Sequence, residues 1–389
     1  MHRAAPSFVK TVLLTLGRLP KALELARALH GAGARVLVAD PFARHLTGSS
    51  RAVERSFVVT APAVDPGRYL DELRGIVVRQ GVDIVQPISE EIMHVADLRG
   101  TLPSRCSLRA MPPAALLAVH DKGRFVEVCT AAGVRAPQTH RLGEHEAQAL
   151  VAARDVVVKP VASCSGRGVE FVARGAALPQ RAEACVVQQR IDGQLLSTFS
   201  IARAGELLQT VVYRGAVMQG TVAVCFERID ASPAVLDWVG QFVGHTRFDG
   251  FVSFDLIVDQ SGVVFGIECN PRATSGIHFV APQDLAQAVL EPSFSGPMQF
   301  RPERLQQQFY PCLTETQKSM FSRSFMRNFR CLRTARDVTW DRRDPWPFIA
   351  MPYTAWNIIA LASRRRATFG EVAMLDFERV ASDRGRVLE

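Results

Sequence analysis

The stretch from Gly250 to His278 reads GFVSFDLIVDQSGVVFGIECNPRATSGIH and contains two short strand patterns. Residues 251–258 and 263–267 are rich in Val, Ile and Phe, and the turn-forming sequence DQSG lies between them at 259–262. Apolar runs on either side of such a turn predict a β-hairpin. The hairpin and its tail also concentrate acidic, amide and guanidinium side chains.

Three oxygen-bearing side chains are expected to meet on one face of this hairpin. Side chains on a strand alternate between faces, so Glu268 and Asn270 point the same way. A turn of two or four residues sets Asp255 across from Gly266, on that same face, whereas a turn of three residues breaks the alignment. Two carboxylates and an amide suit a hard cation such as Mg²⁺ bound with phosphate oxygens, and Arg272 can hold an anion. The alternative is an exposed hairpin with ordinary surface acids.

The composition describes a globular protein of two or three domains. The chain has 389 residues, 48% apolar content and a formal net charge of +8. We interpret this charge as spread along the chain, which favours small anionic substrates such as phosphates or carboxylates. No zinc-finger spacing, RNA-recognition string or dense basic–aromatic run is identified, so no nucleic-acid partner is expected.

The cysteines and the apolar runs favour a cytoplasmic protein. None of the eight cysteines forms a C-x-x-C pair and several lie in apolar runs, which is typical of reduced, buried thiols. The apolar run at 12–16 is too short for a signal peptide. The run at 346–362 contains two prolines and is short for a membrane span. We therefore expect no transmembrane segment.

The first 112 residues predict a parallel α/β domain. Strands at 12–16 and 35–39 flank a helix at 20–30, which is a βαβ unit with a right-handed crossover. The loop GRLP at 17–20 lacks G-x-G-x-x-G, so the fold is Rossmann-like but a dinucleotide site is disfavoured. Further elements are expected at 57–59, 69–79, 82–87 and, after the capping sequence SEE at 89–91, a helix to about residue 98.

A lysine beside a loop of small residues is the main feature in the middle of the chain. Lys159 ends a buried strand at 156–160, and the loop SCSGRG follows at 163–168. Such a loop can wrap phosphates with backbone N–H groups, although an ordinary hairpin connection explains it about as well. The chain has 41 arginines but only five lysines, and a lysine retained here favours a compact ammonium group at a phosphate.

Helix and strand patterns continue as far as residue 290. A helix begins at Asp121-Lys122 and stops before Gly133. Further strands are expected at 185–189, 196–202, 206–214 and 221–226, and helices at 233–245 and 277–290.

These motifs resemble those of the ATP-grasp superfamily, within it the branch of carbamoyl-phosphate synthetase and biotin carboxylase. The similarity covers about residues 11–290. Its most specific part is ECNPR at 268–272, with Asp255 on the preceding strand. Supporting parts are DK at 121–122, VKP at 158–160, SGRGV at 165–169 and QQRIDG at 188–193.

The resemblance implies a combined α/β and α+β architecture. It implies a Rossmann-like pre-ATP-grasp domain at 1–112 and an ATP-grasp domain at 113–292 whose two subdomains clamp ATP. The lid subdomain is expected at about 113–190 and the metal-binding subdomain at about 191–292. Residues 293–389 are expected to form a mainly helical C-terminal extension that serves as a substrate cap or an oligomer contact, with a homodimer as one alternative.

The resemblance also implies roles for the residues of the hairpin. Asp255, Glu268 and Asn270 are expected to hold one or two Mg²⁺ ions, with Mn²⁺ as an alternative. Arg272 is expected to steady an acyl phosphate, and Arg214 is a looser candidate for the same anion.

Nucleotide contacts are implied upstream of the hairpin. Lys122 and Lys159 are expected at the phosphates of ATP, Lys159 with a catalytic role. Leu195 stands where the family commonly has a ribose-binding Glu, and glutamines occupy a hinge that often has Glu, so the nucleotide preference stays open. His278 is expected to be structural rather than catalytic. The remaining expected ATP-binding residues, in the loop and the hinge strand, are Ser165, Gly166, Gly168, Gln188, Gln189 and Ile191.

The implied function is an ATP-dependent ligase. A carboxylate attacks the γ-phosphate of ATP, the loop shields the acyl phosphate from water, and an amine or other nucleophile then displaces phosphate. The expected partners are a small-molecule carboxylate and an amine, with a carrier-bound acyl group as an alternative. Two interpretations compete: a bicarbonate-activating enzyme of the carbamoyl-phosphate-synthetase or carboxylase type, and a nucleotide-binding module without turnover.

The last hundred residues carry two further patterns. An amphipathic helix packed on the core is expected at 319–336, with a substrate cap as the alternative. The run at 346–362 predicts a buried helix, a dimer contact, an apolar substrate wall or a membrane-surface contact. The apolar residues that recur at helical spacing in the first pattern are Phe321, Phe325, Phe329 and Leu332.

Overall fold

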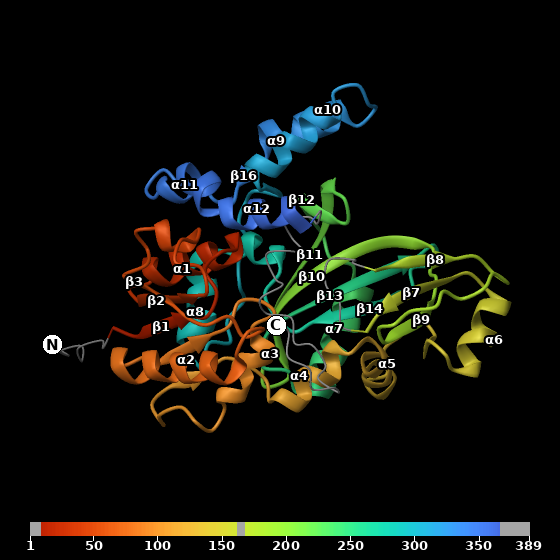
Figure 1. Ribbon diagram of the computed structural model, residues 1–389, viewed down its shortest axis with the longest axis horizontal. Coiled ribbons are helices and arrows are strands. Elements are labelled where there is room, and N and C mark those ends of the chain that lie inside the picture. Colours follow the sequence, from red (N-terminus) through yellow and green to blue (C-terminus); the bar gives the residue numbers. More distant parts are fainter. Residues whose placement is uncertain (1–8, 162–167, 366–389) are drawn as a thin grey trace.

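A five-stranded parallel sheet forms the N-terminal domain. The computed structural model describes residues 9–161 and 168–365, and this sheet lies at one end of the molecule (Figure 1). The strand order is β3-β2-β1-β4-β5 and all pairs are parallel, so the predicted βαβ unit is confirmed. Its elements are β1 (Thr11–Leu14), α1 (Pro20–Gly31), β2 (Arg35–Asp40), β3 (Arg55–Val58), α2 (Pro66–Gln80), β4 (Ile84–Gln86), α3 (Ile92–Val95) and β5 (Ser107–Leu108).

The loop between β1 and α1 is closed around a buried ion pair. Backbone N–H groups of Gly17 and Arg18 donate to Asp40 Oδ2 at 2.9 and 3.2 Å, and the Arg18 guanidinium lies 2.8 Å from Asp40 Oδ1. A Cβ atom at Gly17 would lie 2.2 Å from the His45 ring and 2.7 Å from Val38. The amides that bind pyrophosphate in dinucleotide sites are therefore used internally, in agreement with the missing glycine motif.

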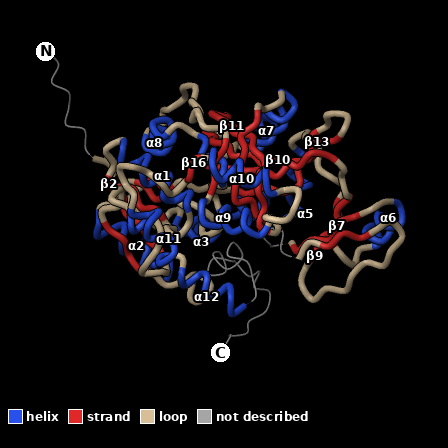
Figure 2. Tube along the Cα trace, turned by 90° about the horizontal axis from the view of Figure 1, so that it is seen from above, coloured by secondary structure: helices blue, strands red, loops and turns tan. Residues whose placement is uncertain are grey.

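A small antiparallel sheet lies at the opposite end of the molecule (Figures 1 and 2). Its strand order is β6-β9-β7-β8, and valines of β7 and β9 pack with α6 in an apolar cluster of their own. The strands predicted at 156–160 and 185–189 are both confirmed. The elements are β6 (Thr139–Arg141), α6 (His145–Ala153), β7 (Val156–Pro160), β8 (Glu170–Val172) and β9 (Cys185–Gln189).

A seven-stranded sheet lies between these two parts, in the order β14-β13-β10-β11-β12-β15-β16 (Figure 1). On one face Phe125 of α5 and Phe242 of α7 pack against Phe254 of β13. The other face shares the core of the N-terminal domain, because α8 packs on α1. The elements are α4 (Pro113–His120), α5 (Lys122–Ala131), β10 (Gly193–Arg203), β11 (Glu206–Gln219), β12 (Val222–Ile229), α7 (Pro233–Thr246), β13 (Gly250–Asp259), β14 (Val264–Asn270) and α8 (Pro282–Leu290).

The C-terminal region is partly strand and mainly helix. β15 (Leu305–Gln307) and β16 (Arg336–Asp337) extend the central sheet, so the region beyond residue 292 contributes to that sheet. The helices gather on one side of the molecule (Figure 1), and no described helix is long and apolar enough to cross a membrane. They are α9 (Phe309–Lys318), α10 (Phe325–Thr334), α11 (Trp346–Thr354) and α12 (Trp356–Arg365).

The prediction of an amphipathic helix at 319–336 is wrong about where the helix starts and about which of its faces is buried. α10 begins at residue 325, and Phe321 is 99% exposed in the turn before it. Phe329 is also exposed and stacks on Phe325, with ring centroids 5.8 Å apart. Asn328 and Cys331 are buried instead, because α10 packs on α9, β11 and β15 through that side. Helical periodicity located the element but not the face that contacts the protein.

Candidate active site

The hairpin β13–β14 brings Asp255 and Glu268 directly opposite each other. Its turn has three residues, because the Asp259 N–H donates to the Val263 carbonyl, and this is the turn length that was expected to break the alignment. A bulge at Ile267 shifts the register by one residue between the turn and the acids. The bulge compensates for the turn, and the predicted shared face of the two carboxylates is confirmed.

The two carboxylates differ in their electrostatic environment. Asp255 accepts a hydrogen bond from Ser197 Oγ at 2.7 Å, but burial and the neighbouring Glu268 raise its pKa to about 7. Burial also opposes ionisation of Glu268, yet the ammonium groups of Lys122 and Lys159 hold its pKa below the ordinary value. At neutral pH Glu268 is therefore ionised and Asp255 is about half ionised, so the pair offers carboxylate oxygens to a cation.

The two predicted lysines converge on Glu268 from different elements. Lys122 is the first residue of α5, which Asp121 caps, and its Nζ lies 3.6 Å from Glu268 Oε2. Lys159 lies on β7, and its Nζ donates to Gln188 Oε1 at 2.7 Å. Burial lowers the pKa of Lys159 to about 8, and the charge of Lys122 acts in the same direction while Glu268 opposes it. Two ammonium groups thus border the carboxylate pair.

Arg272 is held in place by residues on both sides of the domain boundary. Its Nη2 donates to Asn270 Oδ1 at 2.9 Å, and its Nε donates to Glu90 Oε1 at 2.7 Å. Burial opposes ionisation of Glu90, but Arg272 lowers its pKa to about 2. Asn270 Nδ2 lies 3.4 Å from Glu268 Oε1, so the arginine and the acids form one network.

Glu90 was assigned from the sequence only to a helix cap. It follows β4 at the carboxyl edge of the parallel sheet, which is where α/β sheets bind ligands. That position in the predicted sheet is the signal that points to it.

His120 is a second residue that the sequence did not single out. It ends α4, and burial lowers its pKa, while the charges that act on it include Glu90 and Glu268. Its Nδ1 is buried and has no hydrogen-bond partner among the described residues. Its position two residues before Lys122 is the only signal in the sequence.

His278 lies in a different environment, as expected. Its Nδ1 lies 2.9 Å from Glu24 Oε2 of α1, and Arg336 of β16 lies 3.4 Å from the same oxygen. This cluster joins α1 to the C-terminal region and is structural.

The remaining predicted residues are placed unevenly. Gln188 is buried and accepts a hydrogen bond from Lys159, Gln189 is the last residue of β9, and Ile191 lies in the short link to β10. Gly168 has φ +73°, and a Cβ atom there would lie 2.7 Å from Pro160 Cγ, so glycine is required. Ser165 and Gly166 lie outside the described residues.

Arg214 does not join this site. Ser197 of β10 pairs with Asp255 of β13 on one side and with Tyr213 of β11 on the other. The three side chains therefore share one face of the sheet. Arg214 follows Tyr213 and points to the other face, where its guanidinium lies 2.8 Å from Glu227. The expectation that it contacts the same anion as Arg272 is corrected by this alternation.

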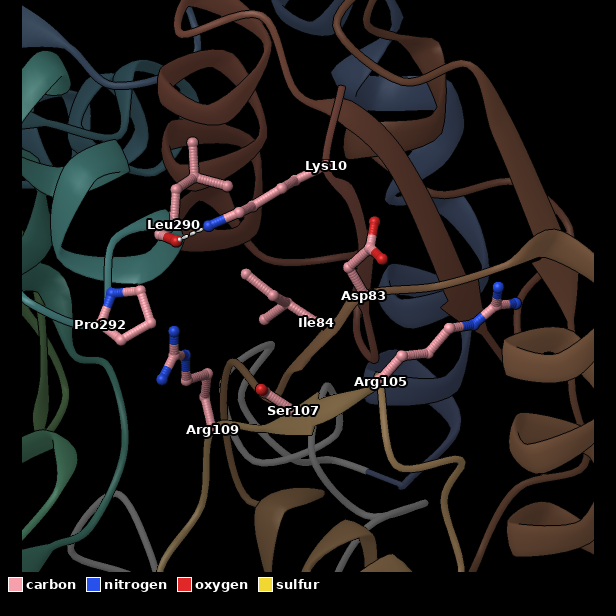
Figure 3. Close-up of a pocket in the computed structure, with 8 residues that line it drawn as sticks. All are labelled: Lys10, Asp83, Ile84, Arg105, Ser107, Arg109, Leu290 and Pro292. Atoms are coloured by element: carbon pink, nitrogen blue, oxygen red, sulfur yellow. Dashed lines mark hydrogen bonds between the residues drawn. The ribbon is translucent and has the colours of Figure 1, made fainter. Parts of the chain in front are cut away.

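A cavity at the other edge of the N-terminal sheet is separate from these residues. Lys10, Asp83 and Ser107, which line it, stand at the amino ends of β1, β4 and β5, whereas Glu90 follows the carboxyl end of β4 (Figure 3). Lys10 donates to the Leu290 carbonyl and Arg109 to the Val289 carbonyl (2.8 Å). These cations cap the end of α8.

The donor set fits a divalent cation bound jointly with phosphates. No cluster of three or more His, Cys, Asp or Glu side chains suited to a metal occurs among the described residues. Asp255, Glu268 and Asn270 instead supply two carboxylates and an amide, which leaves coordination positions for phosphate oxygens and water, as Mg²⁺ requires.

Comparisons with known proteins agree with this arrangement. Residues 119–276 match a family model described as ATP-grasp domain. The curated proteins contain no match.

Solved structures share the fold at low identity. The L-amino acid ligase from Bacillus licheniformis is 19% identical with a TM-score of 0.56, over 76% of this chain and 78% of that one. N5-carboxyaminoimidazole synthetase from Staphylococcus aureus is 13% identical with a TM-score of 0.58, over 75% and 80%. The biotin carboxylase domain of the Hydrogenobacter thermophilus 2-oxoglutarate carboxylase, solved with MgADP and bicarbonate, is 14% identical with a TM-score of 0.57, over 75% and 72%. The chain thus matches the ATP-grasp domain family over residues 119–276 and shares the fold of these three solved structures.

Proposed function

We propose that this protein is an ATP-dependent ligase that joins a carboxylate to an amine or another nucleophile and releases ADP and phosphate. The observation that carries the proposal is the pairing of Asp255 with Glu268 beside two lysines and Arg272. Such a set offers cation ligands, phosphate-binding ammonium groups and an anion-binding guanidinium within one site.

Each group has a role in nucleotide binding. Asp255, Glu268 and Asn270 would hold Mg²⁺, or Mn²⁺ in its place, which neutralises charge on the phosphate oxygens. Lys122 and Lys159 offset the remaining charge of the phosphates. The adenine is assigned to the hinge strand at 188–191 and the phosphates to the loop that ends at Gly168.

The reaction then proceeds in two displacements. An oxygen of the substrate carboxylate attacks the γ-phosphorus, and the bond from that phosphorus to the ADP oxygen breaks. Arg272, oriented by Glu90 and Asn270, binds the resulting acyl phosphate. The nucleophile attacks the carbonyl carbon, loses a proton and expels phosphate. Enclosure by the two subdomains protects the acyl phosphate from water.

The test is a screen of carboxylate and amine pairs for ADP release, followed by mass spectrometry of the product. Turnover with one pair, absent without the amine, supports the ligase. Tight ATP binding without ADP release for any acid would instead identify a binding module.

A bicarbonate-activating enzyme is the second candidate. The observation that favours it is the fold shared with a biotin carboxylase domain solved with bicarbonate. ADP release that depends on bicarbonate and needs no other carboxylate would select this candidate over the first.

A reducing compartment agrees with either reaction. The described cysteines are all free and all but one are buried. We place the enzyme in the cytoplasm, where thiols stay reduced.

A further inference from the structure

Helices α11 and α12 display an apolar stripe to solvent. Trp346, Ile349, Tyr353, Trp356 and Ile359 follow one another at spacings of three and four residues. Their exposed fractions run from 43% to 64%. Such spacing places the side chains on one helical face, and a contiguous exposed apolar face of this kind marks an interaction site.

The opposite side of these helices anchors them to the protein. Met351 packs with Leu23 of α1 and with Leu46, and Ile358 is buried. Asp344, in the loop before α11, bonds the Arg27 guanidinium at 2.9 Å. The exposed stripe therefore belongs to a well-packed element.

The positive charge of the chain is concentrated in the segment of sequence that carries this stripe. Residues 318–365 contain ten basic and three acidic side chains, a net charge of +7, whereas the whole chain carries +8. This count corrects the interpretation of the charge as spread along the chain. One of the three acids, Asp344, is buried in its contact with Arg27. Arg342 and Arg343 are exposed, and in the sequence they lie between Trp340 and the stripe.

The turn before α10 repeats the same combination on the same side of the molecule (Figure 1). Phe321 and Met326 are 99% and 71% exposed, and Arg323 and Arg327 are exposed beside them. Exposed aromatic and basic side chains thus occur together in the turn before α10, on α10 itself and in the loop before α11.

We propose that this surface binds an anionic membrane surface. We call it the aromatic–basic face and define it by Trp340, Arg342, Arg343, Trp346, Ile349, Tyr353, Trp356 and Ile359. Indole and phenol rings are favoured at the level of lipid head groups, and arginines beside them are attracted to anionic lipids. The proposal is independent of the ligase reaction.

Other occupants fit the face less well. A second copy of the chain would bring two strongly positive surfaces together, which like-charge repulsion opposes. An acidic protein would match the charge, but it would need recesses shaped for side chains that protrude from the surface. The head-group region of a bilayer accepts protruding rings without a preformed recess.

The native tryptophans provide a direct assay. Trp238 is buried, whereas Trp340, Trp346 and Trp356 are 47%, 63% and 64% exposed. Vesicles of phosphatidylcholine mixed with phosphatidylglycerol should shift the emission of the full chain to shorter wavelength and carry the protein into the pellet. Vesicles of phosphatidylcholine alone should bind much less, and added salt should weaken binding to the mixed vesicles.

Two double variants separate the apolar and the charged contributions to vesicle binding. Arg342→Gln with Arg343→Gln should weaken binding about fivefold per arginine, about 25-fold in the pair. Trp346→Ser with Trp356→Ser should abolish pelleting with an unchanged melting temperature. The matched control is Val64→Ser with Val78→Ser, which removes two exposed apolar side chains elsewhere and should bind as the natural chain does.

Three results would overturn the proposal. The first is no pelleting with mixed vesicles, or equal pelleting with neutral ones. The second is an emission shift produced by soluble polyglutamate without lipid, which would indicate an acidic protein partner. The third is a dimer by light scattering that the Trp346→Ser, Trp356→Ser variant dissociates.

Discussion

At the scale of single residues, the candidate site depends on charges that burial makes strong. Glu268 stays ionised because two ammonium groups border it, while Asp255 holds its proton more tightly because it is buried and faces Glu268. A divalent cation bound at the proposed site would therefore compete with that proton for the same carboxylate. The lysines were predicted from their rarity and their positions, but their approach to Glu268 is a tertiary feature.

Replacing Glu268 by glutamine should reduce ADP release about 100-fold or more, since loss of a group that supports a metal costs 10–100-fold even in the outer shell. The substitution keeps the shape of the side chain, so the melting temperature should change little. Asp259→Asn is the matched control, because it makes the same kind of change at the last residue of β13, next to the turn of the same hairpin. Full activity of the Glu268→Gln protein would remove Glu268 from the metal site.

Mg²⁺ binding should tighten as the pH rises through about 7. The pKa of Asp255 is raised to about 7, so the carboxylate is mostly protonated at pH 6 and mostly ionised at pH 8. Since the cation binds only the ionised form, its affinity should increase about tenfold over this interval. Titration calorimetry at the two pH values measures the change, and Asp255→Asn should remove it. Equal affinities at both pH values would contradict this role for Asp255.

At the scale of elements, local sequence patterns located most helices and strands but not their contacts. The βαβ unit, the capped start of α5 and the strand β9 agree with prediction because apolar period and cap chemistry are local. The sequence pattern also located α10, but it did not predict which face of the helix is buried, because that depends on the contacts of α10 with α9 and β15. The two-residue strands β5 and β16 are too short to leave a pattern.

Gly17→Ala should destabilise the loop between β1 and α1. The new Cβ atom would lie 2.2 Å from His45, and overpacking of this kind costs about 1–3 kcal/mol. Gly31→Ala is the control, because no atom lies within 4 Å of its Cβ position at the end of α1. Urea unfolding should give a lower free energy of unfolding for the first variant alone. Equal stabilities would show that the loop relaxes around the methyl group.

At the scale of the whole molecule, a buried charge cluster joins the first helix to the last part of the sheet. Glu24 of α1 contacts His278, Arg301 and Arg336, the last from β16. Burial opposes ionisation of Glu24, but Arg336, His278 and Arg301 hold its pKa well below the ordinary value. The C-terminal helices are therefore tied to the N-terminal domain, and the aromatic–basic face keeps a defined position on the molecule.

Glu24→Gln should cost about 3–5 kcal/mol, because it leaves two partly buried guanidinium groups without their carboxylate partner. Because the pKa of Glu24 is lower in the folded than in the unfolded protein, its stabilisation is present above about pH 4.5 and is lost as the pH falls below it. Unfolding free energies of both proteins at pH 7 and at decreasing pH measure both effects. Glu54→Gln, in the exposed pair with Arg35, should cost about 1 kcal/mol or less. A similar small loss for Glu24→Gln would contradict the structural role of the cluster.

Features that depend on neighbours along the chain could be predicted from the amino-acid sequence. The strands of the hairpin, the order of acid, amide and arginine on it, and the two lysines at element ends follow from local period and turn chemistry. The bulge at Ile267, which returns Asp255 and Glu268 to one face although the turn has three residues, is visible in the folded structure alone. The tertiary structure alone joined Glu90 to Arg272, excluded Arg214 and exposed the aromatic stripe of α11 and α12. Register and burial depend on strands and helices distant in the sequence, so no local pattern contains them.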